Sequence, residues 1–130
     1  MFLASACGST PSGEDKTVSG TVAVELDVFS GRPNPTWTLA EPDATAYREK
    51  VGGLPVASSG QVANNLGYRG FVVRTGDEVV VVQRGVVRKT KGSTTAYASD
   101  PNRDLERWLL RSGRSSVEPE VLTSVEREIG

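Results

Sequence analysis

The chain of 130 residues carries a formal net charge of −1 and contains no histidine. This length suits one domain with its own hydrophobic core, and the ordinary apolar and glycine content excludes wholesale disorder. Because the net charge is close to zero, no overall electrostatic field would attract the protein to nucleic acid. The lack of histidine removes the commonest general base and the commonest metal ligand.

A short motif near the N-terminus indicates processing. The single cysteine, Cys7, excludes an internal disulfide, and Leu3-Ala4-Ser5-Ala6-Cys7 resembles a bacterial lipobox, whose cysteine is lipidated. Ala4 stands where leucine is usual, and the motif lacks the preceding basic residue and apolar run of about 7–15 residues. A start site placed too late or a trimmed signal would explain both departures. A frayed terminus with a chance cysteine is the alternative interpretation.

We expect three parts along the chain. Residues 1–7 read as a truncated signal with its lipobox, residues 8–20 as a flexible polar tether, and residues 21–130 as a single domain. No later segment approaches the ~20 apolar residues of a membrane span.

The domain opens with a strand over about 21–29, in which every second side chain is apolar. This alternation is typical of an antiparallel strand with one wet face. A stiff connector with two X-Pro steps, residues 29–37, then leads into a helix. Pro42 lies in the first turn of this helix, with Thr38 in position to cap it, and Gly52-Gly53 ends it.

The middle of the chain predicts more strands. Apolar runs at 71–74 and 78–83 flank Thr75-Gly76-Asp77, which indicates a hairpin because primed turns need positive φ. The second run contains four consecutive valines, so it predicts the central strand, covered by a helix on at least one side. Shorter strands are expected near 86–88 and 94–98.

Two helices close the chain, one started by Asp100-Pro101 and ended by Gly113, the other over about 119–129. Residues 56–66 show only a weak hydrophobic pattern, so we expect a loop there, with a helical turn near 61–66. The order of elements favours an α+β fold, with a small antiparallel sheet of about four or five strands and about three helices packed on it.

The connector is the first candidate site. Arg32 and Asn34 each precede a proline, which holds both extended, so their side chains point the same way. With Trp37 as an apolar wall, they would suit a carboxylate, phosphate or sugar. Tyr68 and Arg69 would border this loop if the two strands pair.

A structural role for the connector is the alternative. Arg32 would then bond loop carbonyls or Asp27, Asn34 would close an Asx-turn, and Trp37 would pack under the first helix. We predict no catalytic residue, metal ligand or cofactor. No serine lies in Gly-X-Ser-X-Gly, no spacing pairs two carboxylates, and the glycines at 67 and 70 enter a strand, away from any helix N-terminus.

Three segments together look like an uncharacterised group of small bacterial envelope proteins: Val-Phe-Ser-Gly-Arg-Pro-Asn-Pro-Thr-Trp at 28–37, Leu-Gly-Tyr-Arg-Gly-Phe at 66–71 and Asp-Pro-Asn-Arg-Asp-Leu-Glu-Arg-Trp-Leu at 100–109. The resemblance covers most of the chain after residue 20. It implies a secreted or lipid-anchored domain and supplies no activity.

The resulting hypothesis is a non-catalytic binding or accessory module of the bacterial cell envelope. It would be anchored on the extracytoplasmic side by membrane lipid through acylated Cys7, and its ligand would be a small molecule or a protein, with no role for nucleic acid. One alternative is a hydrolase or transferase that works through carboxylates. The other is an inhibitor or scaffold that binds a protein through the exposed loop.

Overall fold

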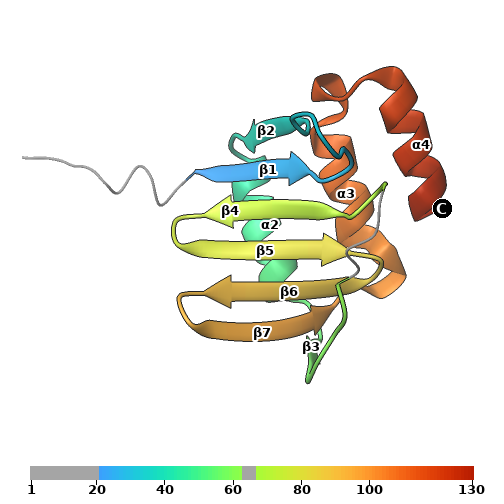
Figure 1. The fold of residues 1–130 in the computed structure, drawn as a ribbon. Helices are drawn as coiled ribbons and strands as arrows, with labels where there is room; N and C mark the ends of the chain where they lie inside the picture. Colours follow the sequence, from blue (N-terminus) through green and yellow to red (C-terminus); the bar gives the residue numbers. More distant parts are fainter. Residues whose placement is uncertain (1–20, 63–66) are drawn as a thin grey trace, which may run out of the picture.

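A computed structural model describes residues 21–62 and 67–130, which form one seven-stranded antiparallel sheet with helices on one face (Figure 1). The expected lipobox and tether lie outside these residues. The strands are β1 (Val22–Leu26), β2 (Thr36–Leu39), β3 (Val56–Ala57), β4 (Phe71–Thr75), β5 (Glu78–Gln83), β6 (Val86–Lys91) and β7 (Thr94–Ser99), in the spatial order β2-β1-β4-β5-β6-β7-β3. The helices are α2 (Asp43–Gly52), α3 (Asp104–Ser112) and α4 (Pro119–Ile129), with short 3₁₀ turns η2 (Pro101–Arg103) and η3 (Arg114–Ser116).

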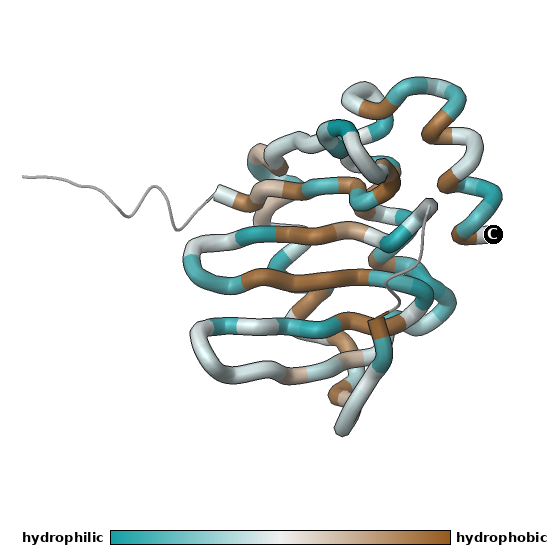
Figure 2. Tube along the Cα trace, viewed as in Figure 1, coloured by the Kyte–Doolittle hydropathy of each residue, from teal (hydrophilic) through white to brown (hydrophobic). Residues whose placement is uncertain are grey.

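The α+β class and the antiparallel sheet are therefore confirmed, but the expected count of four or five strands is too low. The four strands from β4 to β7 form a meander joined by two-residue turns, and β5 is the central strand, as its four valines predicted. Figure 2 shows the continuous hydrophobic run along β5. The two strands missing from the prediction are β2 and β3, and β3 pairs only through Val56 and Ala57 with β7.

The connector after β1 does not lead directly into a helix. It is the loop of a β-hairpin, because β2 pairs antiparallel with β1 and sets Trp37 opposite Val24. The alternation Thr-Trp-Thr-Leu is a strand pattern in which the two larger side chains face the core. Thr38 is thus a strand residue, and the carboxylate of Glu41 caps α2 by accepting the N–H and hydroxyl of Thr45 at 3.1 and 2.6 Å.

The hydrophobic core lies between the sheet and its helices. Every second side chain of β1, β4 and β5 is buried there against α2, α3 and α4; the largest buried apolar residues are Phe71, Leu26, Leu109, Val22, Val24, Val73, Val80, Val82, Val87 and Val125. On the other face the chain after β3 returns over Val86, and a Cβ on Gly60 would lie 2.8 Å from that side chain.

The closing helices match their predicted positions. Pro101 begins a 3₁₀ turn rather than the helix itself, α3 follows from Asp104, and Gly113 ends it. In the part of the chain that the structure describes, none of the helices is long and apolar enough to cross a membrane.

Candidate ligand-binding groove

Asn34 is folded inward in the hairpin loop. Its Oδ1 accepts hydrogen bonds from the backbone N–H groups of Val28 and Phe29, at 3.0 and 2.8 Å. Its Nδ2 donates to Glu25 Oε2 at 2.8 Å and more weakly to Asp27 Oδ1 at 3.4 Å. The hydrogen bond from Asn34 is the main cause that lowers the pKa of Glu25. With both ends of its amide engaged, Asn34 holds the shape of the loop.

Arg69 brings the start of β4 to this loop, as expected if the strands pair. Its Nε and Nη2 donate to Asp27 Oδ1 at 3.1 and 2.9 Å, and Nη2 also reaches the carbonyl of Phe29 at 2.7 Å. Only 14% of the Arg69 side chain is exposed. This arginine therefore fastens the loop to the chain that enters β4, an interior strand of the sheet.

Trp37 packs between β2 and the end of α3. Its indole N–H donates to Ser112 Oγ at 3.0 Å, and its ring lies edge-on to Phe71 with 6.4 Å between centroids. The backbone of Gly113 passes so close that a Cβ there would lie 2.0 Å from Trp37 Cε2. Trp37 is thus a packing residue, and it offers no wide apolar surface to a partner.

Arg32 makes contacts separate from those of Asn34. Its guanidinium stacks on the Phe29 ring at 3.7 Å from the centroid and pairs with Glu118 at 3.4 Å, in front of α4. The side chain is 56% exposed. Of the five residues predicted for the site, Arg32 alone presents its charge to solvent.

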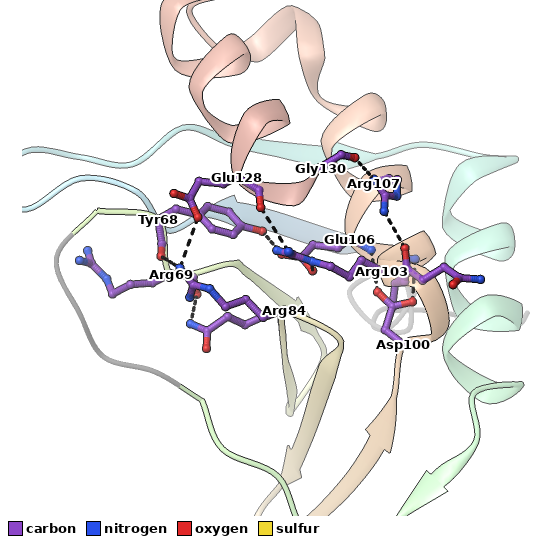
Figure 3. A network of polar contacts seen from close by, with 12 residues as sticks. Tyr68, Arg69, Arg84, Asp100, Arg103, Glu106, Arg107, Glu128 and Gly130 are labelled. Carbon is purple, nitrogen blue, oxygen red and sulfur yellow. Dashed lines mark hydrogen bonds and ion pairs between the residues drawn. The ribbon is translucent and has the colours of Figure 1, made fainter.

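Tyr68 belongs to a buried polar network behind the loop (Figure 3). Its hydroxyl donates to Glu106 Oε2, and Arg103 donates to both Glu106 oxygens at 2.9 Å each. Glu106 is fully buried, so its charge depends on these partners. Burial raises the pKa of the Tyr68 phenol, and the hydrogen bonds to Glu106 raise the pKa of Arg103.

The start of α3 completes this network. The Asp100 carboxylate accepts the N–H groups of Leu105 and Glu106 at 2.8 and 3.0 Å, while burial raises its pKa. Arg103 reaches Glu106 from a left-handed backbone conformation, with φ of 59°. Every charged group here has a partner, so the network braces α3 against the sheet and holds the Tyr68 ring in place.

Two adjoining hollows lie between the hairpin loop and α4, and we call them together the groove. The larger, of about 420 Å³, is lined mainly by Val28, Phe29, Tyr68, Arg84, Glu120 and Glu128. The smaller, of about 280 Å³, is lined mainly by Phe29, Arg32, Pro33, Asn34, Pro35 and Glu118. Phe29 borders both, and Arg32 covers one face of its ring.

An exposed ion pair crosses each hollow. Arg32 pairs with Glu118 at 3.4 Å, and Arg84 pairs with Glu128 at 3.5 Å (Figure 3). Exposed pairs of this kind stabilise a fold by only ~0–1 kcal/mol, so a ligand can replace either partner at little cost. Glu120 also lines the larger hollow and has no ion pair within the described part of the chain.

Arg84 occupies a strained position. It forms the two-residue turn between β5 and β6 with Gly85, and both have positive φ, 48° and 83°. Such turns favour Asn, Asp or Gly at the first position, because a longer L-residue there costs ~1 kcal/mol or more. The turn nevertheless carries an arginine, whose guanidinium lies over the Tyr68 ring at 5.7 Å and lines the groove.

The two glutamates that line the larger hollow lie far apart along α4. Glu120 and Glu128 are eight residues apart on α4, a rise of about 12 Å. Paired catalytic carboxylates of glycosidases lie about 5–9.5 Å apart. Among residues 21–62 and 67–130, no group of three or more Cys, Asp or Glu is placed to hold a metal ion.

No protein-family model, curated protein or solved structure matches the chain. Of the residues that line the groove, Arg32, Asn34 and Tyr68 were predicted from the sequence, whereas Phe29, Arg84 and the glutamates of α4 were not. One signal was available for Arg84, since Arg-Gly between two valine runs places an arginine in a tight turn.

Proposed function

We propose that this protein is a non-catalytic binding module of the bacterial cell envelope, lipid-anchored on the extracytoplasmic side through Cys7. In the groove it takes a small ligand that carries both a carboxylate and an amine, as amino acids and short peptides do. The observation that carries this proposal is that two exchangeable Arg–Glu pairs cross adjoining hollows that share the Phe29 ring.

The chemistry of the lining supports a zwitterion. A ligand carboxylate can replace Glu128 at Arg84, or Glu118 at Arg32, with the bidentate geometry that guanidinium favours. A ligand amine suits Glu120, which has no ion pair with any residue that the structure describes, and an apolar portion suits Val28 and Phe29. The larger hollow falls within the usual ~300–1,000 Å³ of small-molecule sites.

The decisive variant is Arg84→Asn. Asparagine accepts the left-handed turn position more readily than arginine does, which offsets the loss of one exposed ion pair. The variant is therefore expected to keep or slightly exceed the thermal stability of the wild type. It should lose the stabilisation that amino acids and dipeptides give the wild type in a thermal-shift screen.

A matched pair of glutamates supplies the control. Glu120→Gln removes a carboxylate that lines the groove, whereas Glu49→Gln removes an exposed one on α2. The first is expected to weaken zwitterion binding about tenfold and the second to leave it unchanged. Equal binding by the wild type, Arg84→Asn and Glu120→Gln would contradict the proposed site.

The membrane anchor has its own test, which does not depend on the groove. Expressed in bacteria with its native leader, the protein should incorporate labelled palmitate and sediment with membranes. Cys7→Ser should abolish both, because the thiol is the acceptor of the lipid. Unchanged labelling of Cys7→Ser would refute anchoring through this residue.

A further inference from the structure

A separate hollow lies on the other side of α4. It has a volume of about 220 Å³ and is lined by Arg107, Leu110, Arg111, Arg114, Glu126, Ile129 and Gly130. Residues 126 and 129 face away from residues 120, 124 and 128 on the helical wheel, so the two sites occupy opposite sides of one helix. This hollow shares no residue with the groove.

Three arginines converge on this hollow from α3 and η3. Arg107, Leu110 and Arg111 follow the i, i+3, i+4 spacing of one face of α3, and Arg114 lines the same hollow from η3, beyond the end of that helix at Gly113. Like charges four residues apart repel along a helix, so the stripe destabilises the element that bears it. The hydrogen bonds of Arg107 and the position of Arg111 in the last turn of α3 offset part of this repulsion.

The cationic charge is only partly balanced inside the molecule. Arg107 donates to the carbonyl oxygens of Asn102, at 2.8 Å, and of Gly130. Arg111 and Arg114 make no ion pair or side-chain hydrogen bond within the described part of the chain, although Glu126 lies across the hollow. Counted over the lining side chains, three guanidinium groups face one carboxylate, an excess of about two positive charges, and Arg111 and Arg114 are the two arginines whose charge is available to a ligand.

We propose that this hollow binds the phosphate group of a phosphomonoester. A phosphomonoester carries a charge of about −1.5 to −2 at pH 7, which matches the excess, and its three free oxygens suit several guanidinium forks. A carboxylate, with one charge and two oxygens, is saturated by a single arginine. The volume lies below that of drug-sized sites, so it suits one anionic group, with Leu110 and Ile129 as the apolar floor.

The test titrates the full chain with inorganic phosphate at constant ionic strength and follows the Nε–Hε resonances of the arginines by NMR. We expect saturable shifts at Arg111 and Arg114. Arg111→Gln and Arg114→Gln should each weaken phosphate binding about tenfold or more, whereas Arg127→Gln, an exposed arginine of α4 outside the hollow, should not.

Glu126→Gln provides a prediction of opposite sign. Removal of the acidic side chain that lines the hollow should tighten phosphate binding about two- to fivefold, an effect that a purely structural role of these residues would not produce. Acetate at the same ionic strength should bind far more weakly than phosphate. Acetate binding as tight as that of phosphate would overturn the assignment to phosphate.

Vesicles of phosphatidylcholine with and without phosphatidic acid separate the two sources of such a group. Retention of the Cys7→Ser protein on the phosphatidic acid vesicles, lost in Arg111→Gln, supports a lipid phosphomonoester, and free phosphate binding alone supports a soluble one. Absence of binding to both phosphate and these vesicles, or equal losses in Arg127→Gln, would refute the proposal.

Discussion

Replacement of Asn34 by alanine should lower the free energy of unfolding by about 2–4 kcal/mol. Two backbone N–H groups, those of Val28 and Phe29, lose their acceptor, and each such bond contributes about 0.5–1.5 kcal/mol. Glu25 also loses its 2.8 Å amide donor. This is a large share of the ~5–15 kcal/mol that stabilises a domain of this size.

The loss should depend on pH. The Asn34 amide, with help from Arg74, lowers the folded pKa of Glu25. A lowered carboxyl pKa stabilises the fold above the unfolded value of about 4.3, and this contribution disappears as pH falls through the folded pKa. The difference between the wild type and Asn34→Ala should therefore be larger at pH 7 than near pH 3.

Urea unfolding at the two pH values measures this difference, with Ser30→Ala, an exposed residue of the same loop, as the control. The control should remain within about 0.5 kcal/mol of the wild type. If Asn34→Ala also remained within that margin at pH 7, the loop would not depend on this amide. A loss that failed to shrink in acid would refute the part assigned to Glu25.

Three further predictions concern the buried aromatic residues. In thermal unfolding, Tyr47→Phe should stabilise the fold by ~1 kcal/mol, because the buried Tyr47 hydroxyl has no partner among the described residues. Tyr68→Phe should instead destabilise the fold by ~1–3 kcal/mol, because Glu106 loses a hydrogen-bond donor. Burial raises the pKa of both tyrosines, a contribution that stabilises the fold below their unfolded pKa of about 10 and is lost as pH rises above it. An absorbance titration should accordingly show these two phenols ionising only as the protein unfolds in alkali; ionisation of all tyrosines in the folded state would contradict this. Gly113→Ala should lower the free energy of unfolding in urea by ~2 kcal/mol or more, because the added Cβ would lie 2.0 Å from the Trp37 ring. In the double variant, Trp37→Ala should reduce this loss. Additive losses would show that the two residues do not interact.

Local signals in the sequence predicted much of the fold. Glycine-containing turns between apolar runs located the hairpin at Gly76, and prolines and terminal glycines located the helices. The pattern of β2 was overlooked because four residues give a weak period and the adjacent Pro42 is a strong helix signal. β3 is shorter still, and it exists only because β7 lies beside it.

The groove depended on tertiary contacts that no local pattern contains. Phe29, Arg84 and Glu120 come from three distant parts of the chain and meet only when α4 packs against α3 near the end of β1. Conversely, the prediction that Arg32 and Asn34 project together followed from backbone direction alone. The orientation of the Asn34 side chain is determined by its hydrogen-bond partners, because two backbone N–H groups and two carboxylates lie within reach behind the loop.

The most direct test of the proposed function is to map a bound zwitterion on the protein by amide chemical-shift perturbation. Titration of the labelled full chain with a panel of amino acids and dipeptides should perturb Phe29, Tyr68 and Arg84 most strongly, together with residues 120–128 of α4. The same titration of Arg84→Asn should leave these resonances unmoved. Perturbation confined to the sheet face opposite the helices, around Val72 and Arg88, or none with any member of the panel, would contradict a ligand site in the groove.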